Sequence, residues 1–330
     1  MKELSDVFLK LSPDLKKIDQ IILDFAVGKS PLIAEISKHL ISSGGKRIRP
    51  VLLLLSAQVC GAKIIEKHHN LAAAVELIHS ATLLHDDVVD TSEVRRGKKT
   101  ANAIWDNKSS ILVGDYLFSI AFQLMVRCQN LRALDLLSKA SSVMADGEVM
   151  QLENSTDVAL SKEKYLEIIF GKTAILFSAA CEAGAIISSY DESKIAALRE
   201  FGKNLGIIFQ IVDDLLDYSS QENVLGKDVG NDFFEGKVTL PIILTFERAN
   251  EAERTFIEQS FTKNLLGSDR NLSDLAAILA LIEKHKGFEA ARNLASHYQK
   301  LAMQNLEIFS NEAQKKNLVA ILDYSLSRIF

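Results

Sequence analysis

Apolar residues recur at intervals of three and four positions along most of this chain, which is the spacing of one face of an α-helix. The pattern is clearest in six segments, which cover residues 50–60, 68–91, 109–127, 130–153, 162–187 and 191–220. Further helices are expected between Pro241 and the end of the sequence. No pair of strands is predicted. The sequence therefore predicts an all-α fold, a large single-domain helical bundle over residues 1–330.

Polar breaks between these segments predict helix starts and one loop. Ser12-Pro13 and Ser30-Pro31 each place a serine before a proline, the arrangement preferred at the first turn of a helix. The stretch at 221–237 interrupts the helical pattern with three glycines and several polar residues, so a polar loop is expected there.

Composition narrows the possible classes of protein. The net charge of −5 and a pI near 5.9 argue against a nucleic-acid-binding protein, whose domain would be basic. The three cysteines lie far apart without metal-type spacing, which is typical of reduced thiols in the cytoplasm. The N-terminal segment lacks an apolar signal core, and Glu76, Asp86 or Asp213 interrupts the longest apolar stretches. We therefore expect a cytoplasmic protein without a transmembrane helix.

Two acidic clusters end otherwise apolar segments. Each has two adjacent aspartates and a third one helical turn further on: Asp86, Asp87 and Asp90 in the first cluster, and Asp213, Asp214 and Asp217 in the second. Residues four apart share a helix face, so the first and last carboxylates of each cluster repel each other. Oxygen ligands without His or Cys favour Mg²⁺ or Mn²⁺, and Mg²⁺ usually completes its shell with water and phosphate oxygens. One such cluster would equally suit a solvated helix end, but two favour metal ions around a diphosphate.

Basic residues form the complementary pattern. The segment Gly44–Pro50 reads GGKRIRP and puts three cations just before a helix start, where free backbone N–H groups also attract anions. Arg95 and Arg96 follow the first acidic cluster closely, and arginine pairs suit bidentate contacts to phosphate. Together with the carboxylates, these residues indicate a substrate that carries a diphosphate. The apolar helix before the first cluster indicates that this substrate has an apolar tail.

These motifs occur in the order and spacing of the trans-isoprenyl (polyprenyl) diphosphate synthases, a family that the chain resembles over nearly its whole length. The motifs that carry the resemblance are GGKRIRP, HDDVVD followed by RRG, GKT, FQIVDDLLD and GKDVGNDFFEGK. The combination is most similar to the long-chain type, the octaprenyl and decaprenyl diphosphate synthases. The resemblance implies a helical bundle around a deep central cavity, and commonly a homodimer.

The resemblance also implies roles for individual residues. Metal binding is implied for both acidic clusters, with about three Mg²⁺ ions per active site and Mn²⁺ as a substitute. The isopentenyl diphosphate site would consist of Lys46, Arg49, His79 and Arg96. The allylic diphosphate would be bound by Arg95, Lys172, Thr173, Gln210, Lys227 and Lys237. The groups expected to act at the reacting bond are Asp86, Asp90, Asp213, Lys172, Thr173 and Gln210.

The implied reaction needs no nucleophilic side chain. Metal ions and basic residues stabilise charge on the leaving diphosphate, and cavity walls shield the resulting allylic carbocation from water. The double bond of isopentenyl diphosphate then attacks this carbocation, and proton loss gives a product longer by one isoprene unit. The partners are thus two prenyl diphosphates, with no nucleic acid and with transient membrane contact as a route for product release.

Product length should depend on the first obstruction below the first acidic cluster. Ala81 lies five residues before Asp86, about 7.5 Å along a helix, and short-product members of the family have an aromatic residue there or beside it. The helix here offers small or aliphatic side chains at the expected positions, Ala81, Thr82, Ile78 and Ala74. We therefore expect a product of about C40 to C50, of the kind used for quinone side chains.

Other interpretations remain open from the sequence. A geranylgeranyl or farnesyl diphosphate synthase differs only in product length. A terpene cyclase shares the DDxxD motif but usually lacks GGKRxRP, and a non-catalytic synthase subunit usually lacks aspartates that are present here. A di-iron carboxylate protein would fit the spacing of Glu66 with His69 and of Glu76 with His79, although these pairs lie only ten residues apart.

Overall fold

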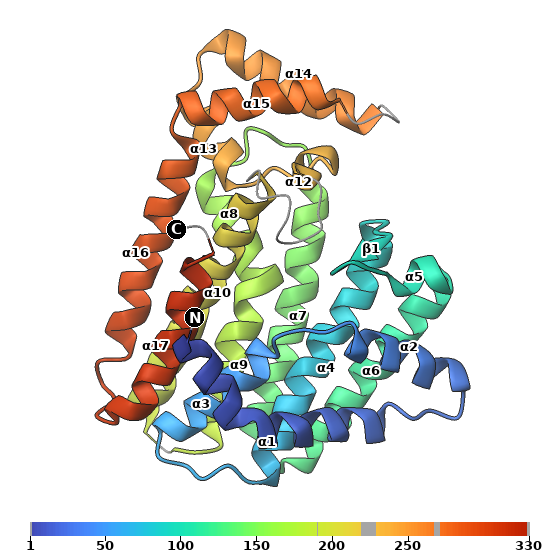
Figure 1. Cartoon of the computed structure of the whole chain (residues 1–330), viewed down its shortest axis with the longest axis vertical. Helices are drawn as coiled ribbons and strands as arrows, with labels where there is room; N and C mark the ends of the chain where they lie inside the picture. The colour runs from blue at the N-terminus through green and yellow to red at the C-terminus, as the bar shows by residue number, and fades with distance from the viewer. Residues whose placement is uncertain (1, 190, 219–228, 267–270, 329–330) are drawn as a thin grey trace. The chain divides into compact units, whose positions relative to one another are not determined.

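The computed structural model describes residues 2–189, 191–218, 229–266 and 271–328, and nearly all regular structure in these ranges is helical (Figure 1). The all-α prediction is confirmed. The chain divides into two compact units. The first consists of Met1–Ser142, Leu176–Gly202 and Met303–Ile321, and the second of Val143–Ile175, Lys203–Ala302 and Leu322–Phe330.

The first unit is built around one buried helix. Its helices are α1 (Lys2–Phe25), α2 (Pro31–Ser42), α3 (Ile48–Val59), α4 (Glu66–Val89), α5 (Ala101–Ile104), α6 (Asn107–Arg127) and the start of α7 (Leu131–Glu153). Helix α4 packs along α6 and also against α1 and α3, and it is buried continuously from His68 to Ile78. A helix that is buried on all sides needs an apolar sequence all round, which explains the unbroken apolar run before the first acidic cluster.

A short hairpin follows α4 and was not predicted. Strand β1 (Val94–Arg95) pairs antiparallel with β2 (Lys98–Lys99). Arg96 and Gly97 form the turn with φ values of 53° and 74°, the left-handed conformation that a two-residue hairpin turn requires. Strands of two residues are too short to produce an alternating pattern, so periodicity provides no signal for them.

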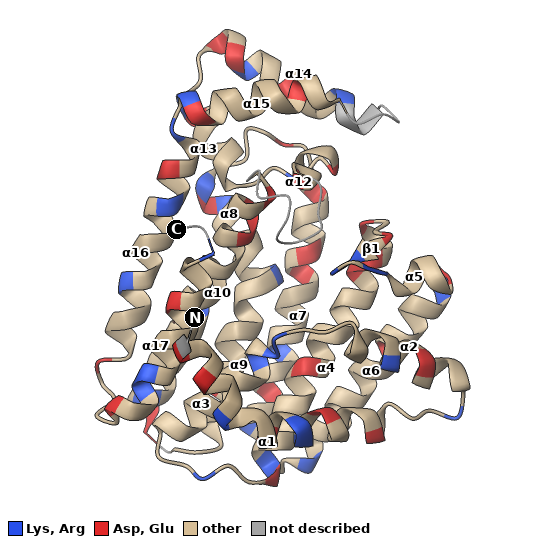
Figure 2. Cartoon of the chain, in the orientation of Figure 1, with Lys and Arg blue, Asp and Glu red and all other residues tan. Residues whose placement is uncertain are grey.

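The second unit contains the remaining helical elements. They are α8 (Lys162–Ile169), a π-helical turn η1 (Phe170–Ala174), most of α10 (Glu192–Asp217), α12 (Asn231–Phe234), α13 (Leu240–Arg248), α14 (Glu251–Leu266), α15 (Leu272–Lys284) and most of α16 (Gly287–Asn305). Helix α9 (Ile175–Ile186) follows η1 directly and lies almost entirely in the first unit, as does part of α17 (Glu312–Leu326). Helices α3 and α9 each contain a single charged residue, as their largely tan ribbons show (Figure 2).

One predicted helix start is confirmed and one was wrong. Helix α2 begins at Pro31 after Ser30, as predicted. Helix α1, in contrast, runs through Pro13 from Lys2, because a proline inside a helix removes one hydrogen bond without always ending it. Of the predicted polar loop at 221–237, residues 221–228 lie outside the described residues. The described part contains α12, whose four residues are too few for a periodic signal.

Among the described residues, two helical segments are long and apolar enough, by length and composition alone, to cross a membrane. They are Asn107–Arg127 and Lys162–Ile186. The apolar window of Lys162–Ile186 is 83% buried within the protein, as expected for a core helix. The window of α6 is only 44% buried, so this helix keeps an uncovered apolar face in the described structure.

Candidate active site

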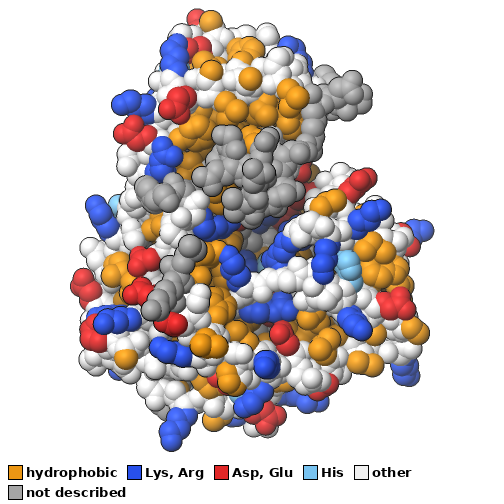
Figure 3. Space-filling model, viewed as in Figure 1, with side chains coloured by type: hydrophobic (Ala, Val, Ile, Leu, Met, Phe, Trp, Pro, Cys, Tyr) orange, Lys and Arg blue, Asp and Glu red, His pale blue; other side chains and the backbone are white. Residues whose placement is uncertain are grey.

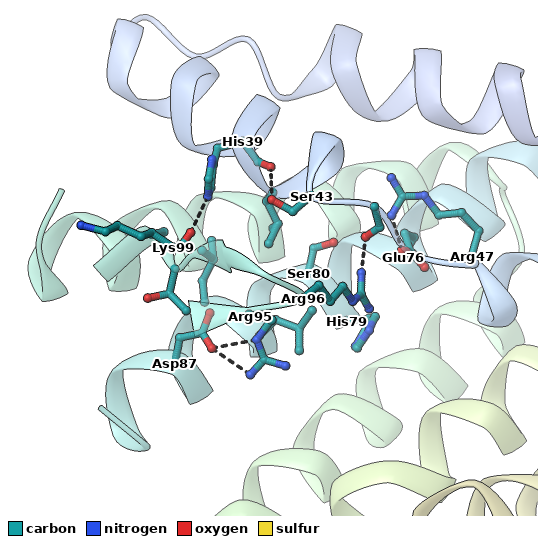
Figure 4. A pocket seen from close by; sticks show the side chains of 16 residues that line it. His39, Ser43, Arg47, Glu76, His79, Ser80, Asp87, Arg95, Arg96 and Lys99 are labelled. Atoms are coloured by element: carbon teal, nitrogen blue, oxygen red, sulfur yellow. Dashed lines mark hydrogen bonds and ion pairs between the residues drawn. The ribbon is translucent and has the colours of Figure 1, made fainter. Parts of the chain in front are cut away.

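The first acidic cluster lies at the C-terminal end of α4. Asp86 and Asp90 are half-buried, and the Asp90 N–H donates to the Asp86 carbonyl at 2.8 Å, so the helical spacing of the two residues is kept. Asp87 is only 2% exposed, and the Nε and Nη2 atoms of Arg95 each lie 2.8 Å from its Oδ1 atom (Figure 4). Burial raises the pKa of Asp87, whereas the Arg95 guanidinium lowers it. The outer carboxylates therefore remain accessible, while the middle one is bound to the hairpin.

A basic pocket lies beside this cluster in the same unit. Its lining includes His79, Arg95 and Arg96, and lysine and arginine side chains gather around the hairpin on the surface (Figure 3). Burial, together with the charges of Arg49, Arg96, Arg95 and Arg47, lowers the pKa of His79 well below its ordinary value. His79 is therefore neutral at pH 7 and lies among cations. Such an environment suits a polyanionic ligand.

Arg47 has a structural role within the GGKRIRP segment. It adopts a left-handed conformation with φ of 48° at the N-terminus of α3. Its Nη1 donates to the buried Glu76 at 2.7 Å (Figure 4), and its Nε donates to Asp19 at 3.1 Å. This ion pair occupies Glu76 and leaves no support for the di-iron hypothesis. The two residues of this segment that were predicted to bind isopentenyl diphosphate lie in other surroundings. Lys46 is exposed, and the Arg49 guanidinium lies over the Phe177 ring, 4.6 Å from its centroid.

Arg96 contacts the glycines of the same segment. It donates from Nη1 to the carbonyl oxygen of Gly44 (Figure 4). A Cβ atom on Gly45 would lie 2.7 Å from Arg96 Nη1, and the φ of Gly45 is +155°. The Arg96 side chain could move aside, but the positive φ is strained for any residue other than glycine, so the backbone conformation favours glycine at this position.

The second acidic cluster repeats the arrangement of the first at the end of α10. Asp213 and Asp217 are half-buried, whereas Asp214 is 2% exposed. The Tyr165 hydroxyl donates to Asp214 Oδ2 at 2.6 Å, and Gln210 Nε2 donates to Oδ1 at 2.9 Å. Burial raises the pKa of Asp214 to about 7 despite these hydrogen bonds. In both clusters the middle aspartate is thus an interior residue with its own donors.

Asp232 joins this cluster and was not identified from the sequence. Its backbone N–H donates to Asp217 Oδ2 at 3.0 Å. Burial and the charges of Asp217 and Asp214 raise its pKa well above the ordinary value. The Lys237 N–H donates to the Asp232 carbonyl at 2.7 Å, and the Lys237 ammonium lies 2.9 Å from Glu235. Asp232 comes from the predicted polar loop, where a single acidic residue gives no distinctive signal.

The GKT segment forms the π-helical turn η1. Lys172 pairs with Glu148 of α7 at 2.8 Å, and Thr173 donates to the Gln210 Oε1 atom at 2.9 Å. Single π turns within α-helices occur frequently at functional sites. The structure therefore connects Thr173 through Gln210 to Asp214 of the second acidic cluster, with Lys172 in the same π-helical turn. The roles of these residues remain predictions.

Comparison with known proteins identifies the family. The model of the family described as polyprenyl synthetase matches residues 30–279. This chain belongs to the polyprenyl synthetase family. It is a prenyltransferase, as the resemblance of its motifs predicted.

Relatives of this synthetase match it over nearly the full length. It is 38% identical to the octaprenyl diphosphate synthase of Haemophilus influenzae, over 96% of this chain and 94% of that protein. It is similar to the crystal structure of a decaprenyl diphosphate synthase from Rhodobacter capsulatus, with a TM-score of 0.93, 43% identity and 99% of each chain covered. The polyprenyl synthase of Caulobacter crescentus, solved with calcium and isoprenyl diphosphate, has a TM-score of 0.92 and 41% identity, with 98% of this chain and 97% of that one covered.

Relatives with other product names match as well. A geranylgeranyl pyrophosphate synthetase from Pyrococcus horikoshii has a TM-score of 0.89 and 33% identity, with 98% of each chain covered. Similarity of fold therefore leaves the product length of this synthetase open.

The residues expected to control product length lie on α4. Ala74, Ile78 and Ala81 follow one another at helical spacing and have no exposed surface. Thr82 is half-buried, and its hydroxyl donates to the His79 carbonyl at 2.9 Å. Their roles in chain length remain predictions. Among the remaining predicted ligands, Lys227 lies outside the described residues.

The donor chemistry of both acidic clusters fits a hard divalent cation. Each offers two half-buried carboxylates one turn apart, and oxygen ligands of this kind suit Mg²⁺ that keeps several waters. Within the described ranges, no group of three or more His, Cys, Asp or Glu side chains lies close enough to enclose a metal ion. A cation bound by two carboxylates of one cluster would need further oxygen ligands from water or phosphate.

Proposed function

We propose that this protein is a long-chain trans-polyprenyl diphosphate synthase that repeatedly condenses isopentenyl diphosphate onto an allylic diphosphate. The proposal rests on an arrangement that the two acidic clusters have in common. In each, the outer aspartates are half-buried and the middle one is buried and hydrogen-bonded. A solvated helix end would not bury one carboxylate of three and supply it with its own donors.

We propose that Mg²⁺ binds the outer aspartates, Asp86 and Asp90 in one cluster and Asp213 and Asp217 in the other. About three ions would neutralise charge on the departing diphosphate. The single polyprenyl synthase-like catalytic domain predicted for residues 1–330 remains part of the proposal, supported by the family match over residues 30–279. The calcium and isoprenyl diphosphate bound by the Caulobacter relative support a divalent cation and a prenyl diphosphate as ligands.

Basic residues would bind the two diphosphate groups. Lys46, Arg49 and Arg96 are proposed to bind isopentenyl diphosphate next to a neutral His79, which donates or accepts a hydrogen bond without adding charge. The basic pocket around His79 supports this assignment. The second diphosphate is proposed to bind Lys172, Lys227 and Lys237, with the remaining N–H groups of Arg95.

Two neutral side chains are proposed to stabilise the carbocation. Gln210 Oε1 and Thr173 Oγ1 are 2.9 Å apart and both carry partial negative charge. Fixed dipoles of this kind stabilise developing positive charge without reorganising during the reaction. The proton that the condensation releases is proposed to leave with the diphosphate.

The proposed product is about C40 to C50, of the kind used for quinone side chains, with a geranylgeranyl or farnesyl product as the alternative. The absence of an aromatic residue at Ala81 supports the long product, as do the octaprenyl and decaprenyl names of two relatives. Replacing Ala81 by Phe should shift products to about C15–C20, because a ring would fill space roughly 7.5 Å below Asp86. Ala145→Phe at an exposed position is the control. Unchanged product length in Ala81→Phe would refute the assignment.

We further propose that the synthase acts as a homodimer in the cytoplasm and contacts a membrane transiently to release product. Helix α6 exposes Ile111, Leu112 and Val126 at 41%, 67% and 61%. This apolar face suits a second copy of the chain, whose α6 would bury it symmetrically. Sedimentation should give a dimer, and a monomer at micromolar concentration would contradict this part of the proposal.

One assay tests the function as a whole. The protein is incubated with Mg²⁺, labelled isopentenyl diphosphate and farnesyl diphosphate, and the dephosphorylated products are sized. Long prenyl alcohols support the proposal, whereas C20 products support a geranylgeranyl diphosphate synthase. Hydrocarbons would instead indicate a terpene cyclase, and no product would indicate a non-catalytic subunit or a farnesyl diphosphate synthase, which does not extend this primer.

A further inference from the structure

A buried tyrosine ends a chain of hydrogen bonds in the second acidic cluster. Tyr165 of α8 is 3% exposed, and its hydroxyl lies 2.6 Å from Asp214 Oδ2. On the other side, Gln210 Nε2 lies 2.9 Å from Asp214 Oδ1, and Gln210 Oε1 accepts from Thr173 at 2.9 Å. Two side-chain donors from different helices thus converge on one buried carboxylate.

The chain of hydrogen bonds has a direction. The NH₂ end of the Gln210 amide faces Asp214, whose Oδ1 atom accepts its hydrogen bond. The amide oxygen consequently faces Thr173 in η1. The position of Asp214 therefore decides which end of the Gln210 side chain is presented beside the π-helical turn.

The hydrogen bonds to Gln210 and Asp214 also fix the orientation of α10 about its own axis. Gln210 and Asp214 form one stripe on this helix, and Asp213 and Asp217 form the neighbouring stripe, about 100° further round. Tyr165 of α8 binds Asp214, and Thr173 of η1 binds Gln210. Because the inner stripe is bound to two other segments, the outer carboxylates point in one fixed direction.

We propose that Tyr165 is a positioning residue for the second acidic cluster, where its hydroxyl holds Asp214 and so orients the Asp213 and Asp217 carboxylates and the Gln210 amide. This inference rests on the proposed function, since it takes the outer carboxylates as cation ligands. Tyr165 itself contacts neither substrate nor metal in this proposal. Its effect passes through Asp214.

Tyr165→Phe tests the proposal because it removes the hydroxyl and keeps the buried ring. Mn²⁺ binding is measured by electron paramagnetic resonance on the full chain, and the Mg²⁺ requirement of condensation is measured in parallel. We expect Mn²⁺ binding to weaken about tenfold, the loss typical of one hydrogen bond to a buried charged group. Tyr116→Phe is the matched control, because it removes a hydroxyl whose contact with the Phe25 carbonyl is 3.4 Å long and lies in the other unit.

A double-mutant cycle separates positioning from general loss of structure. Adding Tyr165→Phe to Asp214→Asn should change Mn²⁺ affinity less than twofold, because the hydroxyl would have lost the group through which it acts. Additive effects, or unchanged Mn²⁺ affinity in Tyr165→Phe alone, would overturn the positioning role. Thermal unfolding confirms that each variant is folded. If the unmodified chain condenses no prenyl diphosphates, the proposed function is wrong. If the unmodified chain is active but Tyr165→Phe leaves Mn²⁺ binding unchanged, only the positioning role is wrong.

Discussion

Helix α7 and the π-helical turn η1 meet at two glycines, and Gly147→Ala tests what this contact does. A Cβ atom on Gly147 would lie 2.5 Å from the Lys172 backbone nitrogen and 2.7 Å and 2.9 Å from the carbonyl carbon and Cα of Gly171. All three are backbone atoms, so neither side can yield by rotating a side chain. Overpacking costs about 1–3 kcal/mol, and the gain of roughly 1 kcal/mol in helix propensity offsets part of it.

Because the clash is with backbone atoms, the cost should lie in the upper half of that range. The net effect should then be about 1–2 kcal/mol of destabilisation and a Tm roughly 2–4 °C lower. Because η1 carries Lys172 and Thr173, the shift that relieves the clash should also misplace them and lower kcat/KM tenfold or more. Scanning calorimetry and steady-state kinetics measure both effects. Ser142→Ala at an exposed position of α7 is the control and should leave stability within about 0.5 kcal/mol. Normal Tm and kinetics in Gly147→Ala would refute the reasoning.

Two further predictions concern charge. Burial and nearby arginines lower the pKa of His79 in the folded protein. Below about pH 6.5 the unfolded chain therefore binds a proton at His79 that the folded protein does not. The free energy of unfolding should fall as pH drops through this range, by up to roughly 1.4 kcal/mol per pH unit. His79→Gln should flatten the dependence of Tm on pH between 6.5 and 5, and an unchanged slope would contradict this. Arg328 Nη1 lies 2.7 Å from Asp213 Oδ1 and competes with a cation there. Arg328→Gln should therefore tighten Mn²⁺ binding about two- to fivefold in a direct titration, whereas weaker binding would show that Arg328 supports the site.

Sequence alone determined the helices and the identity of the two acidic clusters. Apolar periodicity is a local property, and it places α4 and α10 within a few residues of their observed bounds. Helical spacing also predicts that Asp86 and Asp90 share a face, because residues four apart lie one turn from each other. The motifs are short and contiguous, so the family could be recognised without knowing any long-range contact.

Only the tertiary structure decided which aspartates are buried and which donors they contact. Asp87 and Asp214 differ from their neighbours through Arg95 and Tyr165, and Tyr165 lies 49 positions from Asp214 in the chain. Periodicity predicts which face a residue occupies but not which donor from another helix will meet it. Asp232 was missed for the same reason, because its proximity to the second cluster arises from how the chain returns after α10. Burial and hydrogen bonding set the chemistry of a carboxylate, and both depend on packing between segments distant in sequence.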